Sequence, residues 1–447
     1  MEELPKENEK ISVIRAARVS EKIRQARIEL SVRKAWWSDG PLEDAVLLLI
    51  LFLNFYLIFP LIGTDAPAVS FSGPVAPLLA NMISSLTKMS FYYSLQIVYI
   101  VFFLAFPISL YFFIKKLTDR KLIGFFACII SSLPVYMMGR TRILGMFFTQ
   151  DGPHIMSLTI APVALYFLLG FLRNGTVKDL IFASVSAALV ALISPFGLMT
   201  YLIFAAIITF SEVLLGSGRS KILKFILVLV FTGTLCSFWF NPAFFIWMIT
   251  GPMGADVRST VSKLLPISLF ALPILATFGY LLFDRRPNLQ PLFIASFCSI
   301  AFFIITAAGG NLMPSSPTIY RTELGISVAF MAGFIIVSSI EFLKFKVIKV
   351  KFKNKAGNWL SNSLSPLLGT ILIFIAASIR DAMIYNENNV LGIWTDVQKD
   401  NIWTARDNFM GIHALVGYSI TFIGITVLIY LSIRFKYIFN KDNAFLQ

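Results

Sequence analysis

Residues 91–116 read FYYSLQIVYIVFFLAFPISLYFFIKK. The first 24 residues of this stretch carry no charge, and the last two are lysines. Because a helix of ~20 mostly apolar residues spans a bilayer core of ~30 Å, the stretch predicts a transmembrane helix. Lys115 and Lys116 place its carboxyl end on the cytoplasmic side, where the positive residues next to spans collect.

Eleven further stretches have a similar composition, so we predict an all-α, polytopic transmembrane bundle of about twelve spans with the N and C termini cytoplasmic. The predicted spans cover residues 45–63, 91–114, 122–138, 155–172, 180–195, 197–216, 225–243, 265–283, 290–308, 324–343, 364–380 and 412–433. This topology puts 29 of the 38 Lys and Arg residues in cytoplasmic segments. Losing one span would invert every later loop and spoil this sorting, so the charges support the whole set.

The composition agrees with a multi-pass protein of the cell membrane. Hydrophobic residues make up 57% of the chain, and the mean hydropathy is +0.78. The net charge of +14 is spread over cytoplasmic loops and the N-terminal segment, which favours contact with the anionic headgroups of the lipid bilayer and argues against nucleic acid as a partner. Cys128, Cys236 and Cys298 fall in different spans without metal-type spacing, so we expect them to be packing residues.

The chain divides into three regions. Residues 1–43 form a basic cytoplasmic segment whose apolar positions recur as in a helix lying on the membrane, although a partner-binding helix would have the same pattern. Residues 44–345 form the expected transmembrane core, and residues 346–447 a two-span region with an external loop at 381–411. No loop reaches the ~50 residues that an independent core needs, so any site must be built by external loops on top of the bundle.

Ionisable residues are nearly absent from the predicted spans. Glu212 and Glu341 lie close to cytoplasmic ends, where we expect them to reach water. Pumps and proton-coupled carriers place acids or bases deep in the bundle, so this distribution argues against a transporter. The external rim, in contrast, carries acids and arginines, which suit a phosphate-bearing lipid substrate because Arg clamps phosphate oxygens and a carboxylate can take a proton from a hydroxyl. The charged and histidine residues of the rim are Asp65, Arg140, Arg142, Asp151, His154, Asp256, Arg258, Arg321 and Glu323.

These residues also have structural interpretations. Asp151, followed by Pro153, fits a helix N-cap with proline in the first turn. Asp65 fits a solvated helix terminus, and Arg321 fits an anchor at the membrane interface. His154 and the second histidine, His413, fit hydrogen-bonded residues of the rim.

Four stretches carry a family resemblance. They are Asp65 directly after the first span, QDGPH at 150–154 opening a helix, the hairpin ALISPFG at 191–197 followed by SFWFNP at 237–242, and PTIYR at 317–321. Together they resemble the GT-C class of polytopic glycosyltransferases, and more closely the archaeal and bacterial membrane proteins of that superfamily labelled six-pyruvoyl-tetrahydropterin-synthase-related. The resemblance covers roughly residues 45–345.

The resemblance implies an inverting glycosyltransferase that uses a polyprenyl-phosphate-linked sugar at the extracytoplasmic face. Asp65 and Asp151 would be catalytic: Asp65 would deprotonate the acceptor hydroxyl, and Asp151 would orient the acceptor or bind metal. Arg321, Arg142 and Arg140 would bind the lipid phosphate and stabilise it as it departs. The cofactor stays unknown, because a divalent metal fits this chemistry but no Asp-x-Asp pair or other motif requires one.

A non-catalytic membrane subunit or scaffold is the alternative. The external segment 381–411 mixes aromatic residues such as Trp394 and Trp403 with charges and Asn, a composition common in interfaces, and it could dock an extracellular or respiratory partner. A narrower hypothesis is one haem held by His154 and His413, since both fall near the external surface. The chain has 2 His, so two bis-His haems are excluded.

Overall fold

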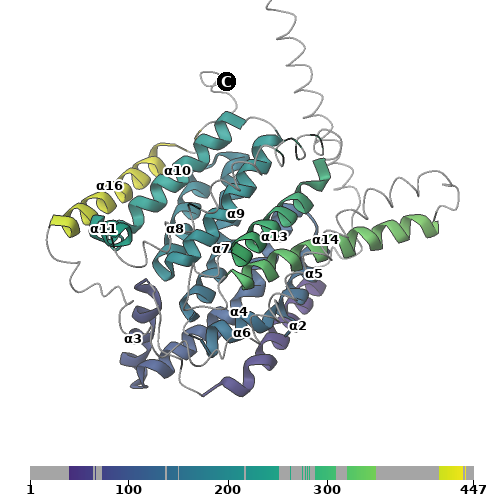
Figure 1. The fold of residues 1–447 in the computed structure, drawn as a ribbon, viewed down its shortest axis with the longest axis horizontal. Coiled ribbons are helices and arrows are strands. Elements are labelled where there is room, and N and C mark those ends of the chain that lie inside the picture. The colour runs from purple at the N-terminus through teal and green to yellow at the C-terminus, as the bar shows by residue number, and fades with distance from the viewer. Residues whose placement is uncertain are drawn as a thin grey trace, which may run out of the picture.

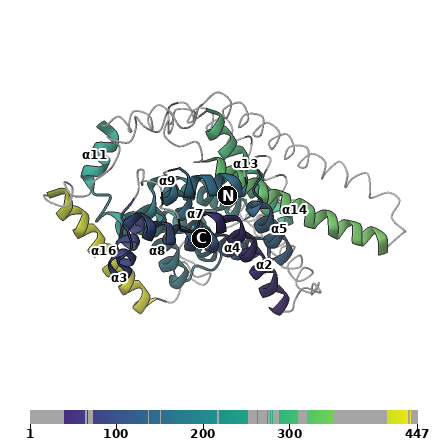
Figure 2. The same ribbon diagram turned by 90° about the horizontal axis from the view of Figure 1, so that it is seen from below.

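The structure, a computed structural model, describes residues 40–63, 73–135, 138–149, 151–215, 218–250, 287–308, 320–348 and 412–435 with a few single positions between them. Asp65, the N-terminal residues 1–39, the predicted span 364–380 and the loop 381–411 lie outside the described residues. Within the described ranges every regular element is a helix, and the helices pack side by side in a bundle (Figures 1 and 2).

Among the described residues, seven helices are long and apolar enough to cross a membrane. They are α2 (Gly40–Ile58, continued by the 3-10 turn η1, Phe59–Leu61), α4 (Phe91–Thr118), α7 (Gly152–Asn174), α9 (Pro195–Leu214), α13 (Gln290–Ala308), α14 (Arg321–Ile348) and α16 (Ile412–Arg434). The remaining elements are α3 (Val75–Thr87), α5 (Lys121–Ser132), α6 (Gly139–Phe147), α8 (Val177–Ile193), α10 (Gly218–Cys236), α11 (Pro242–Thr250) and η2 (Pro287–Leu289). The prediction of an all-α bundle of membrane-type helices is confirmed at this level.

Helix α7 lies at the centre of the bundle (Figure 1). It packs against α4, α6, α8, α9 and α10, and most of its residues are buried on every side. A helix that is apolar all round is buried all round, which is what the near-continuous run of apolar residues in α7 dictates. Helices α13 and α14 pack on each other, and α14 covers α5, so the core continues from α7 to the later part of the chain.

Short connections fix the order of α7, α8 and α9. Gly175 ends α7 with φ 69°, and the Thr176 hydroxyl accepts a hydrogen bond from the backbone N–H of Asp179 to start α8. Ser194 alone separates α8 from α9; its hydroxyl caps α9 by accepting from the N–H of Gly197, with Pro195 in the first turn. The tight hairpin predicted at 194–197 is therefore present.

Ion pairs hold one end of the bundle together, and we call it the basic end. Glu43 at the start of α2 bonds Lys115 near the end of α4 and Lys121 at the start of α5, each at 2.5 Å. The Tyr111 hydroxyl also donates to Glu43, at 2.6 Å. Glu43 thus joins three helix ends that the charge pattern assigns to the cytoplasmic side.

Glu212 of α9 makes a second set of contacts between helix ends that the charge pattern assigns to the cytoplasmic side. Its carboxylate accepts from Arg173 of α7 at 2.9 Å, from Lys221 of α10 at 3.0 Å and from Gln290 of α13 at 3.0 Å. Only 3% of Glu212 is exposed, so the expectation that it reaches water is wrong. The ends of α7, α9, α10 and α13 meet at Glu212. The cations there compensate the carboxylate for the water that it loses on burial. Glu341, bonded to Arg120 at 2.8 Å, keeps 43% of its side chain exposed, as expected.

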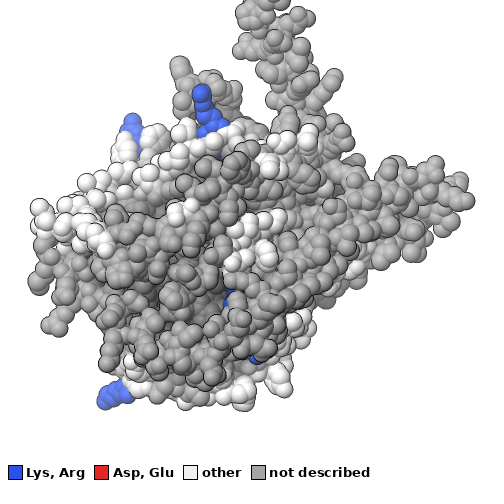
Figure 3. All heavy atoms as spheres, in the orientation of Figure 1, with Lys and Arg blue, Asp and Glu red and all other residues white. Residues whose placement is uncertain are grey.

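Helix α16 joins the edge of the bundle through small residues. A Cβ on Gly417 would come within 2.3 Å of the Ser237 carbonyl oxygen, and one on Gly424 within 2.5 Å of the Thr234 hydroxyl. Thr421 donates to the carbonyl of Thr234 at 2.9 Å. Close approach at small residues, with a polar bond between the helices, is typical of packing in membranes. In Figure 3 the larger Lys and Arg patches of the described residues lie at the upper and lower edges of the view.

Replacing Glu212 by Ala should destabilise the protein more than replacing Glu341 by Ala. The first change leaves Arg173 and Lys221 without their buried partner, which typically costs about 3–5 kcal/mol. The second removes a solvent-exposed pair worth about 1 kcal/mol or less. Thermal unfolding in detergent can be followed with a thiol-reactive dye, because Cys128, Cys236 and Cys298 are all buried and free. Equal midpoints for the two variants would contradict a structural role for Glu212.

Candidate functional site

His154, Glu323 and Thr200 meet at the opposite end of the bundle, where α7, α9 and α14 begin; we call this end the rim end. The Nε2 atom of His154 lies 2.7 Å from Oε1 of Glu323, and the Thr200 hydroxyl donates to the same oxygen at 2.7 Å. At most 2% of any of the three residues is exposed. Glu323 stands in the first turn of α14, where the helix dipole favours a negative charge.

Two atoms of this cluster, which we call the His–Glu centre, lack hydrogen-bond partners in the part of the chain that the structure describes. They are Nδ1 of His154 and Oε2 of Glu323, and both are fully buried. Ser157 donates to the backbone carbonyl of His154, and Ser327 donates to that of Glu323, so the backbone of each residue is fixed by its own helix. The two side chains are held in place by their bond to each other, while one polar atom on each has no hydrogen-bond partner among the described residues.

Arg142 of α6 forms a second buried centre. Its guanidinium carbon lies 4.3 Å from the ring centroid of Phe103 and 4.3 Å from that of Phe106, so the cation is held between two aromatic rings of α4. Its Nη2 donates to Oδ1 of Asn54 at 2.5 Å, and Nδ2 of Asn54 donates to Ser132 at 2.9 Å. These bonds tie α6 to α2 and α5.

The guanidinium of Arg142 is almost completely desolvated. Only 1% of the residue is exposed, and Nε and Nη1 have no partner among the described residues. Burial lowers the pKa of Arg142 to about 9, which leaves the side chain cationic at neutral pH. Two open donors on a buried cation are expensive, and the two ring faces supply the main compensation.

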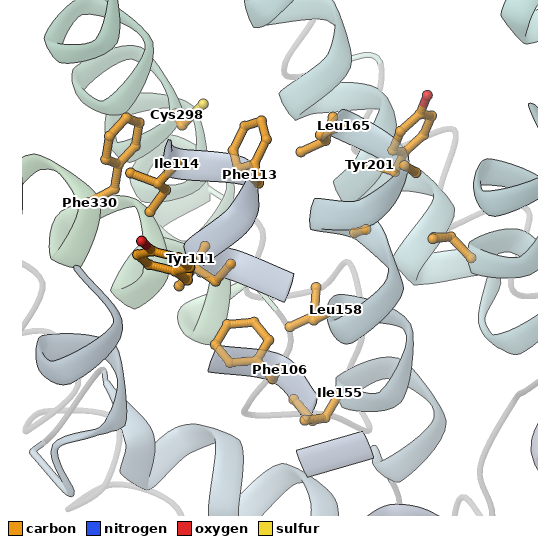
Figure 4. Packing of buried hydrophobic residues seen from close by; sticks show 14 of the residues in the cluster. Phe106, Tyr111, Phe113, Ile114, Ile155, Leu158, Leu165, Tyr201, Cys298 and Phe330 are labelled. Carbon is orange, nitrogen blue, oxygen red and sulfur yellow. The ribbon is translucent and has the colours of Figure 1, made fainter. Parts of the chain in front are cut away.

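An apolar cavity of about 30 Å³ lies among α4, α7, α9 and α14, next to residues that contact the two centres. Phe106, whose ring contacts Arg142, lines one part, and Thr200 and Ser327, which bond Glu323, line another. Leu158 of α7 and Phe330 of α14 contribute further apolar wall, and Figure 4 shows Phe106 and Leu158 approaching from facing helices. A cavity of this size has room for about two water molecules, and its walls offer few polar partners.

The other predicted site residues are placed as follows. Asp151 occupies the N-cap of α7, as its structural interpretation predicts, but it makes no capping bond with its side chain; its Oδ2 accepts from Thr149 at 3.0 Å, and only 2% of the residue is exposed. Arg140 is exposed, and Arg321, the first residue of α14, is half-buried. Asp65, Asp256 and Arg258 lie outside the described residues, so the catalytic role of Asp65 stays a prediction.

The two histidines occupy different surroundings. His154 is buried, with Nε2 bonded to Glu323, whereas His413 is exposed in the first turn of α16. Haem ligation by Nε2 of His154 would require breaking its bond to Glu323, and the haem stays a hypothesis. Among the described residues there is no group of three or more His, Cys, Asp or Glu that could hold a metal ion.

Sequence reasoning missed two residues of these centres, Asn54 and Thr200, and it placed Glu323 on the rim without selecting it as a site residue. Glu323 has a recognisable signal in the sequence, because it is an ionisable residue directly before a long apolar stretch, as His154 is. Asn54 is also detectable as a polar residue inside an uncharged span. Thr200 has no such signal. Threonines in apolar helices commonly bond a carbonyl of their own helix, and the sequence does not distinguish those from a threonine that bonds another helix.

No family model, no curated protein and no solved structure matches this chain.

Replacing Gly197 by Ala should disturb the His–Glu centre without touching its polar groups. The new Cβ would lie 1.9 Å from the Ser157 hydroxyl oxygen, which forces α9 away from α7 and moves Thr200 with it. Gly233 of α10 is the matched control: nothing lies within 4 Å of its Cβ position, so Ala should be neutral or stabilise the helix by up to about 1 kcal/mol. The thiol-dye melting assay compares the two, and equal stability would contradict close packing at Gly197.

Proposed function

We propose that this chain is a non-catalytic integral membrane subunit that docks an extracellular or respiratory partner. The observation that carries the proposal is the burial of ionisable side chains at the rim end, in the part of the chain that the structure describes. Arg142, Asp151, His154 and Glu323, four ionisable residues of the rim end, are each at most 2% exposed. Arg142 donates to Asn54 of α2, Asp151 accepts from Thr149, and His154 bonds Glu323. The cavity beside them is apolar and far smaller than a sugar phosphate.

Closed polar contacts of this kind are suited to holding helices together. Each one joins elements far apart in the sequence: Asn54 with Arg142 joins α2 to α6, and His154 with Glu323 joins α7 to α14. Removing one partner of a buried pair is strongly destabilising, so such residues can be required for folding without any role in chemistry. A rigid frame that presents loops is what a docking subunit needs.

We further propose the full topology of about twelve spans with both termini cytoplasmic. Its support is that the ion pairs of Glu43 with Lys115 and Lys121, and those of Glu212 with Arg173 and Lys221, join segments on the same predicted side. A test uses Ser85→Cys and Lys178→Cys, both at exposed positions but on opposite predicted sides. A membrane-impermeant maleimide should label the first variant in intact cells and the second only after permeabilisation. Labelling of both in intact cells would overturn the topology.

A GT-C-type glycosyltransferase acting on a polyprenyl-phosphate-linked sugar is the second candidate. One observation favours it: Arg142 keeps two N–H groups without partners in the described residues, and these could meet phosphate oxygens if α6 moved. Arg140 of the same helix is exposed. In this candidate Asp65 and Asp151 act on the acceptor, and Arg321 assists at the phosphate.

Purification of the native protein in a gentle detergent, followed by mass spectrometry of everything bound, separates the two candidates. A fixed stoichiometric partner without polyprenyl-phosphate lipid is expected for the subunit. Bound polyprenyl-phosphate lipid without a partner would overturn it in favour of the transferase. In that case Asp65→Asn should abolish sugar transfer while lipid binding persists, and Asp44→Asn, at the opposite end of the first span, is the matched control that should retain activity.

A further inference from the structure

Lys116, Tyr166, Phe167, Lys178 and Phe182 form a surface patch near the basic end, which we call the basic–aromatic patch. The ammonium of Lys116 lies 3.7 Å from the ring centroid of Tyr166. Phe167, the next residue of α7, stacks on Phe182 of α8 with the ring centroids 4.9 Å apart, and the ammonium of Lys178 lies 6.0 Å from the Phe182 ring. All five residues are exposed or half-buried. Side chains of α4, α7 and α8 therefore form one row along the surface, with a lysine at each end.

The basic–aromatic patch carries a net positive charge. Elsewhere at the basic end the lysines next to Glu43 form ion pairs with it. Lys116 and Lys178 form no ion pair in the part of the chain that the structure describes. Asp179 lies close to Lys116, but its carboxylate accepts from the Thr176 hydroxyl at 2.7 Å. With one acid beside two lysines, the patch attracts anions.

An exposed apolar stripe of α8 begins at this patch and runs towards the rim end. Phe182, Val185 and Leu189 recur at three- and four-residue steps, so they share one face of the helix, and all three are exposed. The helix advances by about 10 Å from Phe182 to Leu189. A ligand that fits this surface therefore needs a negative charge at one end and hydrocarbon beyond it.

We propose that the basic–aromatic patch binds an anionic glycerophospholipid from the leaflet at the basic end. Lys116 and Lys178 donate hydrogen bonds to its phosphate oxygens, and one acyl chain lies along Phe182, Val185 and Leu189. Long lysine side chains near helix ends reach the headgroup level while their stems cover apolar surface. The proposal goes beyond both candidate functions and is independent of the choice between them.

The combination of charge and hydrocarbon selects this ligand over two others. A cytoplasmic protein can offer acids to the lysines, but it offers no hydrocarbon to a stripe that runs into the bilayer. A zwitterionic lipid offers hydrocarbon without a net negative charge. The ring contacts hold both lysines at defined positions, so we expect one localised lipid rather than a uniform attraction of the basic end to anionic lipids.

Fluorescence quenching by brominated lipid locates the site. Val185→Cys of α8 and Ile226→Cys of α10 are matched positions for a bimane label, because each stands eight positions after the first residue of a helix that starts at the basic end. Val185 is 40% exposed and Ile226 is 48% exposed, and the native cysteines are buried. The full chain is placed in phosphatidylcholine nanodiscs with a minor fraction of phosphatidylglycerol. Phosphatidylglycerol with brominated acyl chains should quench the label at 185 more than the label at 226, whereas brominated phosphatidylcholine should quench both about equally.

Substitution of the lysines tests the phosphate contact. Lys116→Gln and Lys178→Gln should each raise the fraction of brominated phosphatidylglycerol needed for half-maximal quenching at 185 about fivefold, the loss expected for one cation near the membrane surface. Arg219→Gln is the matched control, because Arg219 is an exposed cation at the start of α10, and this change should leave that fraction unchanged.

Equal quenching of the two labels by brominated phosphatidylglycerol would overturn the proposal, and this comparison leaves both lysines intact. Weak quenching at 185 by both brominated lipids would overturn it as well, because a protein rather than a lipid would then cover the stripe. Excess quenching at 185 that survives both lysine substitutions, or that Arg219→Gln reduces equally, would assign the effect to general surface charge and also contradict the proposal.

Discussion

Inside a bundle of apolar helices a polar side chain finds no water, so its partner has to come from the protein itself. Both ends of this bundle are organised by that constraint. At the basic end Glu43 and Glu212 gather lysines and arginines from helices that the chain reaches at very different points. At the rim end Asn54 meets Arg142, and Glu323 meets His154. These contacts fix which helices are neighbours, and apolar packing then fills the space between them.

The rim end differs from the basic end in one respect that bears on function. Glu212 has cations or amide donors on both of its oxygens, whereas Glu323, His154 and Arg142 each keep at least one buried atom without a partner in the described residues. A polar network in which every atom has a hydrogen-bond partner makes the structure around it rigid. A network with an unpartnered buried atom can still bind a proton, a water molecule or a ligand there. The cavity among α4, α7, α9 and α14 has Phe106, which contacts Arg142, and Thr200 and Ser327, which bond Glu323, in its wall.

Several features of this arrangement follow from local sequence rules. The tight turn at Ser194, the N-cap position of Asp151 and the all-helical class could be predicted because capping residues, prolines and long apolar runs act within a few residues. The burial of Glu212 and Arg142 could not, because a hydropathy pattern shows that a charge stands near a span end and not what meets it there. Four separate helix ends decide that Glu212 is enclosed.

The sequence by itself determined that this chain is helical and apolar, and it determined where many of the helices begin and end, since backbone hydrogen bonding and hydropathy are local. Only the tertiary structure decided which rim residues pair. It placed His154 against Glu323 across 169 positions of the chain, and it enclosed Arg142 between Phe103 and Phe106. Pairing of buried charges depends on which helices become neighbours, and that is set by packing of the whole bundle.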